Sequence, residues 1–431
     1  MDVDPYVPGH GDLAFDVTAY GLDLDYRVTS NHLDARAELH VVTRQAVVRL
    51  ALDLSGLRVR KVLVDGQRPA SFTQRGDRLQ IRLASPATAG ARLVLRIRYD
   101  GNPRPLASPW GEVGWEELDD GVIVAGQPSG APSWFPCNDR PSNKATYRTT
   151  ITAASEYAVV ANGVLTHRRV AGSRTTWVYE QRQPMAAYLA TVQVGRYDRG
   201  DVDAAPVPVR LFRPSHLAAR SDSDFGRQSQ MLAVFTEAFG PYPFDSYAVV
   251  VTDDDLEIPL EAQGLSVFGA NHVDGRRTHE RLVAHELAHQ WFGNSLTAGA
   301  WRDIWLHEGF ACYAEWLWSE RSGGDSAERL ARRHHAVLAA RPSDVVLADP
   351  GPEHMFDDLV YKRGALTLHA LRQHLGNDRF FAVLRSWVAE NRYGTVTTEL
   401  FLQHWCADPA TLGMVETWLR RPALPDLARS R

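Results

Sequence analysis

Hydrophobic residues in the first 198 positions recur in short alternating or wholly apolar runs, the pattern of β-strands. Such runs lie at residues 35–41, 48–54, 93–99 and, in a second β-rich part, between 147 and 194. Turn signals such as Asp65-Gly66 and Asp100-Gly101 separate them. The pattern therefore predicts a β-rich domain over residues 1–198.

Beyond residue 198 the pattern changes to helical periodicity with a few remaining strands. Strand-like runs at 207–212 and 247–252 flank a helical pattern at 229–239, and the chain from Thr278 onward reads as helix and loop. We predict an α+β multidomain protein, with a second, mostly helical domain over residues 199–431 that contains a small sheet.

A long segment rich in proline, glycine and polar residues, 126–141, interrupts the β pattern of the first domain. Irregular segments of this length in compact domains are often functional.

The segment from Thr278 to Gly293 reads as a helix that carries two histidines. Apolar residues recur at helical spacing, no proline interrupts, and Gly293 marks the predicted end. His285 and His289 are four positions apart, so both imidazoles should project from one face of this helix. With Glu286 between them they form H-E-x-x-H, a pattern typical of zinc hydrolases.

A third candidate ligand, Glu308, lies in a second apolar helical pattern that we expect to pack against the first. Two histidines and one carboxylate leave a fourth position for water, as in hydrolytic zinc sites. We therefore predict one Zn²⁺ per chain on His285, His289 and Glu308. The ion would lower the pKa of bound water toward about 7 and polarise a scissile carbonyl. Glu286 would take the proton of the water and pass it to the leaving amine.

Glu315 lies seven residues after Glu308, about two helical turns along. From there it could orient one of the ligand histidines through a hydrogen bond. The alternative is an ordinary solvated glutamate.

The amino-acid composition limits the kinds of partner that the protein is expected to bind. The 431 residues are 44% hydrophobic, which allows two or three domains with sizeable cores. The 47 basic and 52 acidic side chains form no long run of one sign, so nucleic acid and anionic membranes are not expected partners. Three widely spaced cysteines make no disulfide framework. We see neither a signal-peptide pattern nor a membrane-spanning run, and we predict a cytoplasmic protein.

Several motifs together resemble the aminopeptidase N family of zinc metallopeptidases, which belongs to the gluzincin clan and also includes leukotriene hydrolases. The resemblance covers most of the chain. It rests on F-P-C-N-D-R-P at 135–141, K-A-T-Y at 144–147, H-E-L-A-H-Q-W-F-G-N at 285–294, W-L-H-E-G-F-A at 305–311 and Y-K-R-G-A at 361–365.

The resemblance implies an N-terminal saddle-shaped β domain followed by a thermolysin-like gluzincin catalytic domain. It also implies roles for further residues. Tyr361 would donate a hydrogen bond to the oxyanion that forms during hydrolysis, although a core tyrosine is the alternative. Glu261 matches the glutamate that binds the free amine of the substrate, although a plain loop acid is the alternative. Gln127 matches the glutamine of a second substrate-binding motif.

The chain also departs from the family pattern. Ile258 and Ala262 replace a glycine and an asparagine around Glu261, and Ser129 replaces the carboxylate of the Gln127 motif. One anchoring acid instead of two suggests weaker amine capture. The usual C-terminal helical domain is not recognisable after about residue 425. We therefore expect a more open site, unless a second subunit of a homo-oligomer covers it.

The sequence thus predicts a zinc-dependent aminopeptidase that hydrolyses N-terminal residues from peptides or aminoacyl amides. One alternative is a zinc hydrolase of other specificity, either an endopeptidase or a small-molecule amidase. Another is a non-catalytic homologue that binds peptides.

Overall fold

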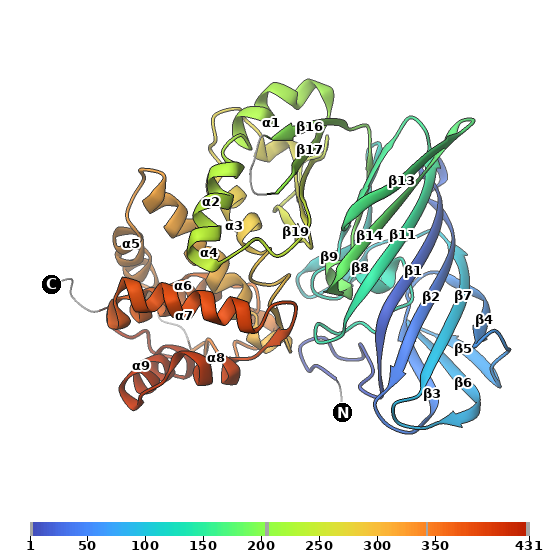
Figure 1. Cartoon of the computed structure of the whole chain (residues 1–431), viewed down its shortest axis with the longest axis horizontal. Coiled ribbons are helices and arrows are strands. Elements are labelled where there is room, and N and C mark those ends of the chain that lie inside the picture. The colour runs from blue at the N-terminus through green and yellow to red at the C-terminus, as the bar shows by residue number, and fades with distance from the viewer. Residues whose placement is uncertain (1–2, 203–206, 342–343, 428–431) are drawn as a thin grey trace.

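The computed structural model describes residues 3–202, 207–341 and 344–427, and Figure 1 shows their arrangement. A tall β-rich part lies at one side, and a mostly helical part with a small sheet lies at the other. This confirms the predicted fold class. In the described ranges, every helix is too short or too polar to cross a lipid bilayer.

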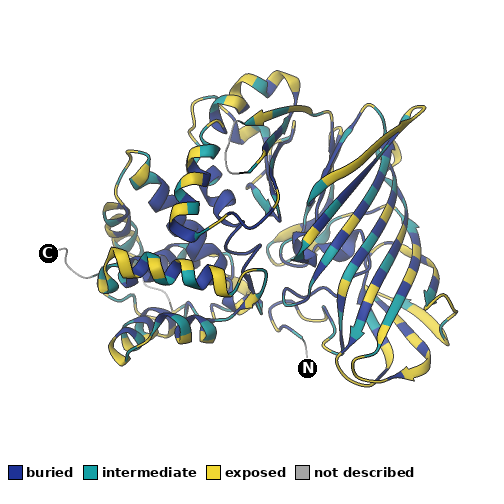
Figure 2. Ribbon diagram, in the orientation of Figure 1, coloured by how far each residue is buried: buried dark blue, intermediate teal, exposed yellow. Residues whose placement is uncertain are grey.

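The β-rich part is built around a seven-stranded sheet in the order β13-β14-β11-β1-β2-β7-β4. Its strands are β1 (Phe15–Arg27), β2 (His32–Thr43), β4 (Arg58–Val64), β7 (Arg92–Gly101), β11 (Lys144–Ala154), β13 (Val164–Ala171) and β14 (Arg174–Ala186). Figure 2 shows buried and exposed residues alternating along these strands. The alternation follows the two-residue period of the sequence, because successive side chains of a strand point to opposite faces.

Two smaller sheets complete this part. One has the order β12-β15-β10-β9-β8, and the other has the order β3-β6-β5. Their strands are β3 (Val47–Asp53), β5 (Ser71–Arg75), β6 (Arg78–Ala87), β8 (Leu106–Ser108), β9 (Gly111–Leu118), β10 (Gly121–Ala125), β12 (Ala158–Ala161) and β15 (Val192–Gly195).

The second part contains a mixed sheet in the order β16-β17-β18-β20-β19 and the helices. The strands are β16 (Asp198–Val202), β17 (Val209–Arg213), β18 (Tyr247–Val251), β19 (Leu260–Ala262), β20 (Leu265–Phe268) and the two-residue pair β21 (Thr297–Ala298) and β22 (Thr395–Val396). The helices are α1 (Ala218–Asp224), α2 (Gln228–Phe239), α3 (Glu280–Ala288), α4 (Trp305–Arg321), α5 (Ala327–Ala339), α6 (Asp358–Leu375), α7 (Asn377–Glu390), α8 (Thr398–Trp405) and α9 (Pro409–Arg420). We propose the domain boundary near residue 198, because β15 belongs to a sheet of the first part and β16 begins the mixed sheet of the second.

The two parts are joined by buried polar contacts that end close to α3. Lys144 on β11 donates hydrogen bonds to the carbonyl oxygens of Asn294 and Ser295, at 3.0 and 2.8 Å. The Tyr188 hydroxyl donates to the carbonyl oxygen of Gly293 at 3.2 Å. The β-rich part therefore holds the turn that directly follows the histidine helix.

Arg363 is buried in α6. Its guanidinium donates to the carbonyl oxygens of Trp418 and Pro422, at 2.9 and 2.7 Å. It therefore ties α6 to the end of α9 and the segment that follows. The three cysteines are free, as expected.

Candidate metal centre and substrate cavity

The histidine helix is one turn shorter than predicted. The sequence predicted its end at Gly293, but α3 ends at Ala288 with His289 as its C-terminal cap. The next residues close wider turns, in which the amides of Asn294 and Ser295 bond back to the carbonyls five residues earlier. Gly293 has a φ of +113°, a conformation that favours glycine. The prediction was wrong here because Trp291 continues the helical spacing, although it packs against α2 from a turn.

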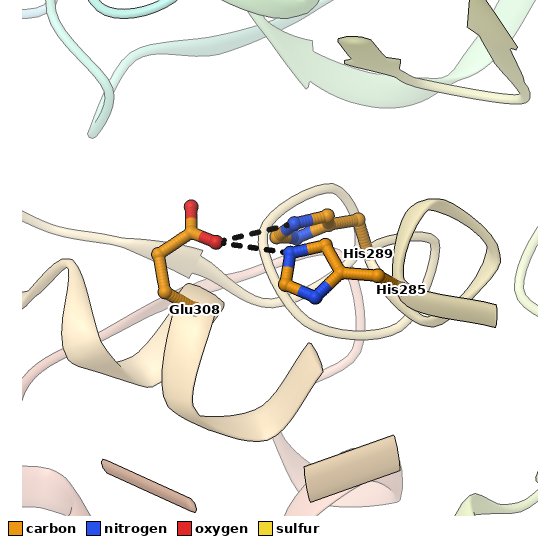
Figure 3. Close-up of side chains that lie close together, drawn as sticks. All are labelled: His285, His289 and Glu308. Atoms are coloured by element: carbon orange, nitrogen blue, oxygen red, sulfur yellow. Dashed lines mark hydrogen bonds and ion pairs between the residues drawn. The ribbon is translucent and has the colours of Figure 1, made fainter. Parts of the chain in front are cut away.

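Both histidines project toward Glu308, which lies in the first turn of α4 (Figure 3). The Nε2 atoms of His285 and His289 lie 3.3 and 3.4 Å from the same oxygen, Oε2 of Glu308. One ligand atom from each of the three residues lies within 4.8 Å of the other two. All three side chains are buried, so charge within the cluster is shielded from water.

Hydrogen bonds behind the imidazoles set their orientation. Nδ1 of His285 lies 2.7 Å from Oε1 of Glu315, and Arg281 donates to both oxygens of Glu315 at 3.0 Å. Nδ1 of His289 lies 3.0 Å from the carbonyl oxygen of Phe292. Each Nδ1 therefore faces an acceptor, which leaves Nε2 as the nitrogen that can bind a metal. The alternative of a solvated Glu315 is wrong, because its side chain is only 2% exposed.

The electrostatics of the cluster favour a bound cation. Burial alone would lower the pKa of His285, but hydrogen bonds to Glu308 and Glu315 raise it to about 9. Burial alone would also lower the pKa of His289. The negative charges of Glu308 and Glu261 outweigh this effect and raise the pKa of His289 to about 10. Burial would raise the pKa of Glu308, yet the two imidazoles hold it well below its ordinary value. The same carboxylates that stabilise protonated imidazoles would stabilise a zinc ion bound to these nitrogens. The residues therefore fit the predicted metal.

Two further carboxylates lie beside the cluster. One oxygen each of Glu261 and Glu286 and a nitrogen of His289 lie within 4.8 Å of one another. Among the described residues, Oε1 of Glu261 and Oε2 of Glu286 are buried without a hydrogen-bond partner. Burial raises the pKa of Glu286 to about 7, assisted by the negative charges of Glu261 and Glu308. Burial also raises the pKa of Glu261. Unpartnered buried oxygens of this kind are suited to a ligand that donates hydrogen bonds.

Tyr361 approaches the cluster from α6 because α4 and α6 cross at a pair of glycines. A Cβ atom at Gly309 would lie 2.8 Å from the Cα of Gly364, so neither position has space for a side chain. This close approach brings the first turn of α6 alongside Glu308. The ring of Tyr361 stacks on His285 with centroids 5.9 Å apart, and it is only partly buried. Tyr361 also packs against the core, but its contact with His285 favours the role that the resemblance implies over that of a plain core tyrosine.

These side chains share one cavity of about 530 Å³. All eight predicted site residues line it, namely Gln127, Glu261, His285, Glu286, His289, Glu308, Glu315 and Tyr361. Gln127 comes from the irregular segment of the β-rich part, and its Nε2 is buried without a partner among the described residues. Ser129 and Ala262, which mark the departures from the family pattern, are not among the lining residues.

Sequence reasoning missed other lining residues, including Arg281, Arg333, His334, Phe356 and Lys362. Arg281 could have been found, because it precedes His285 by one helical turn and therefore shares its face. Phe356 carries no comparable signal, since it lies in a turn before α6.

Two histidines and a glutamate on neighbouring helices, beside a β-rich domain, are the ligand arrangement expected of a gluzincin-type zinc site. Two family models match the chain. The peptidase M1 N-terminal domain covers residues 17–189, and the peptidase family M1 domain covers residues 224–413. The chain belongs to peptidase family M1, which confirms the resemblance drawn from the motifs.

Solved structures agree along the whole chain. An M1 zinc metallopeptidase from Deinococcus radiodurans, a glutamate-to-alanine mutant bound to a Tyr-Ser-Ala substrate, is 31% identical with a TM-score of 0.91 over 99% of both chains. A two-domain M1 zinc metallopeptidase mutant bound to L-tryptophan is 31% identical with a TM-score of 0.91 over 100% of both chains.

Curated relatives are more distant and mostly longer. Aminopeptidase M1-D of Oryza sativa subsp. japonica is 25% identical over 94% of this chain, which spans 49% of that relative. Leukotriene A-4 hydrolase of Xenopus laevis is 24% identical over 95% of this chain and 72% of its own length. The chain thus spans about half the length of the first of these relatives.

Proposed function

We propose that the protein is a zinc-dependent aminopeptidase that removes N-terminal residues from peptides or aminoacyl amides. The observation that carries this proposal is the position of Glu261. One oxygen of its carboxylate lies within 4.8 Å of Glu286 and His289, and its Oε1 is buried without a hydrogen-bond partner among the described residues, so a substrate amine could bind there beside the candidate metal centre. The names of the relatives support it, since they include aminopeptidases and structures with bound amino acids or a tripeptide substrate.

The chain's own residues divide the work. His285, His289 and Glu308 would hold the zinc ion, which supplies Lewis-acid polarisation and activation of water when bound. Glu286, whose Oε2 is buried without a partner among the described residues and which lies beside His289, would accept the proton of the attacking water and return it to the leaving amine. The Tyr361 hydroxyl would donate a hydrogen bond to the developing oxyanion. Glu261 would bind the ammonium group and place the first peptide bond over Glu286.

The departures from the family pattern favour one rival, a zinc hydrolase that does not require a free amine. Ser129 stands where the motif has a carboxylate and Ala262 where it has an asparagine, so amine recognition would fall to Glu261 with Gln127 beside it. Endopeptidase and small-molecule amidase activity belong to this rival.

The test is hydrolysis of a panel of fluorogenic aminoacyl amides, each beside its N-acetylated twin, with and without a zinc chelator. Glu286→Gln serves as the inactive control. Cleavage confined to free amines and abolished by the chelator is the expected result. Equal cleavage of acetylated twins would replace the proposal by the broader hydrolase. Silence toward every amide, with zinc bound, would instead favour a peptide-binding homologue.

Other expectations stay predictions. A homo-oligomer could cover the cavity, and sedimentation at several concentrations would measure its mass. The cytoplasmic location also stays a prediction, which fractionation of the host cell would test.

A further inference from the structure

One wall of the catalytic cavity is formed by an exposed segment between two helices. Phe356 lines the cavity, and it belongs to residues 349–356, which precede α6. Gly351 in this segment has a φ of +84°, and residues 352–354 form a single 3-10 turn. Four of the eight residues, Asp349 and the run from Pro352 to His354, are exposed, whereas Pro350 and Met355 are buried. Met355 anchors the segment in the core, but the residues from Pro352 to His354, just before it, are exposed.

The β-rich part contacts this segment. The tip of the β8–β9 hairpin carries Trp110, whose Nε1 donates to the carbonyl oxygen of Pro352 at 2.8 Å. The ring of Trp110 also meets Phe356 edge to face, with centroids 5.8 Å apart and an interplanar angle of 87°. This is the favourable geometry for an aromatic pair.

A second contact lies at the start of the same segment. The hydroxyl of Tyr6 donates to Oδ1 of Asp349 at 2.5 Å and accepts from the amide of Gly351 at 2.7 Å. Within the described residues, every hydrogen bond that joins 349–356 to a distant part of the chain goes to Tyr6 or Trp110. These hydrogen bonds therefore couple the wall to the β-rich part of the chain.

From these contacts we infer that Trp110 is a positioning residue for substrate specificity. It acts through Phe356, whose ring forms an apolar wall for a large apolar or aromatic side chain of the substrate residue in the cavity. Ile258, which is 63% exposed and lines the same cavity, adds to this apolar surface. The inference rests on the proposed aminopeptidase function and names its substrate class, substrates with a bulky apolar N-terminal residue.

The kinetic test compares phenylalanyl, leucyl and alanyl amides on the zinc-loaded full chain. For Trp110→Ala we expect kcat/KM to fall about tenfold for the two large residues, mostly through KM, because a displaced wall loses contact with them. The alanyl amide, which cannot reach the wall, should change less than about twofold. Trp110→Phe keeps an aromatic edge and should recover most of the loss. Phe72→Ala, which removes an exposed aromatic ring on β5, is the matched control and should leave all three substrates unchanged.

A double-mutant cycle asks whether Trp110 acts through Phe356. If it does, Trp110→Ala should add little to the effect of Phe356→Ala, since contacting residues are not additive. Fully additive losses, or an equal loss for alanyl and phenylalanyl amides, would overturn the inference.

Hydrogen exchange gives a readout that needs no activity and no perfectly folded alanine variant. The amides of Gly351 and of residues 353–357 should exchange faster in Trp110→Ala than in the wild type, while those of α3 and α4 stay protected. Unchanged exchange in this segment would overturn the support by Trp110. A wild type that cleaves no amide would defeat the proposed function, yet the exchange experiment would still decide whether Trp110 holds the wall.

Discussion

The cavity has two unlike sides, a metal side lined by the candidate metal ligands and a substrate side lined by the residues proposed to bind the substrate. On the metal side, His285, Glu308 and Glu315 come from α3 and α4 and bond to one another. On the substrate side, Glu261 comes from the edge strand β19 and Gln127 from an irregular segment of the other domain. His285, Glu308 and Glu315 therefore satisfy their polar groups with one another, whereas Glu261 and Gln127, like the candidate base Glu286, each keep a buried polar atom without a partner among the described residues.

This difference leads us to expect that the two sides contribute differently, the metal side to turnover and the substrate side to substrate binding. Groups that already bond to one another lose several interactions when one member is removed, so the metal side should show large effects on turnover and metal affinity. Unpartnered groups lose only their contact with a ligand, so the substrate side should show its effects in KM. Four substitutions test this division.

Glu286→Gln should have the largest effect. Loss of the proton acceptor should lower kcat by a factor on the order of 10² to 10⁴, while zinc content and KM stay close to those of the wild type. Steady-state kinetics and metal analysis measure both. Glu280→Gln on the same helix, whose carboxylate pairs with Arg227 outside the cavity, is the control. More than a tenth of wild-type kcat in Glu286→Gln would remove it from proton transfer.

Glu315→Gln should act on the metal rather than on the substrate. Loss of the charged partner of His285 should weaken zinc affinity by roughly 10- to 100-fold, with most of kcat restored at saturating zinc. Zinc titration against a competing chelator measures the change. Glu320→Gln, later on α4 and bonded to Arg372, is the control. An unchanged zinc affinity would contradict the idea that the side chains of the metal side depend on one another.

Glu261→Gln should act on the free amine. Loss of a charged hydrogen bond should raise KM for free-amine substrates by about tenfold or more, with a smaller change in kcat. Inhibition by the acetylated twins should stay the same, because they carry no ammonium group. Glu257→Gln, an exposed acid four residues earlier, is the control. An equal change for both kinds of ligand would contradict a role of Glu261 in amine recognition.

Gln127→Ala should have the smallest effect. A neutral hydrogen bond to the substrate is worth about 0.5–1.5 kcal/mol, so kcat/KM should fall by roughly two- to tenfold. The same amide panel measures it, with the exposed Gln67→Ala as control. A loss as large as that of Glu261→Gln would show that the two residues bind the amine as one unit.

The parts of the site that sequence could predict are those that depend on local spacing. His285, His289 and Glu315 lie on helices whose period decides which side chains share a face, so residue numbers alone indicate their relation. The two sheet-rich and helix-rich halves of the fold were predictable for the same reason, since a period of two and a period of 3.6 are visible in the sequence.

The parts that sequence could not predict depend on contacts between distant segments. The amides of Asn294 and Ser295 close wide turns after His289, and a helical pattern of side chains does not reveal the main-chain bonds that end α3. Trp110 and Phe356 lie 246 positions apart and meet only because the β8–β9 hairpin reaches the second domain. The helical or strand periodicity of a sequence does not indicate contacts between segments so far apart.

The crossing of α4 and α6 at Gly309 and Gly364 has a consequence for how such sites change over time. Main chain touches main chain there, and a backbone contact has no rotamers with which to absorb an added methyl group. The relative position of Glu308 and Tyr361 therefore depends on these two glycines, although neither glycine touches a substrate. A descendant that gains a side chain at either glycine would keep its H-E-x-x-H segment and still bind zinc, with the hydroxyl of Tyr361 displaced from the carbonyl it should meet. We expect such chains to survive as metal-binding proteins that have lost turnover, a fate that inspection of the ligand residues alone would not reveal.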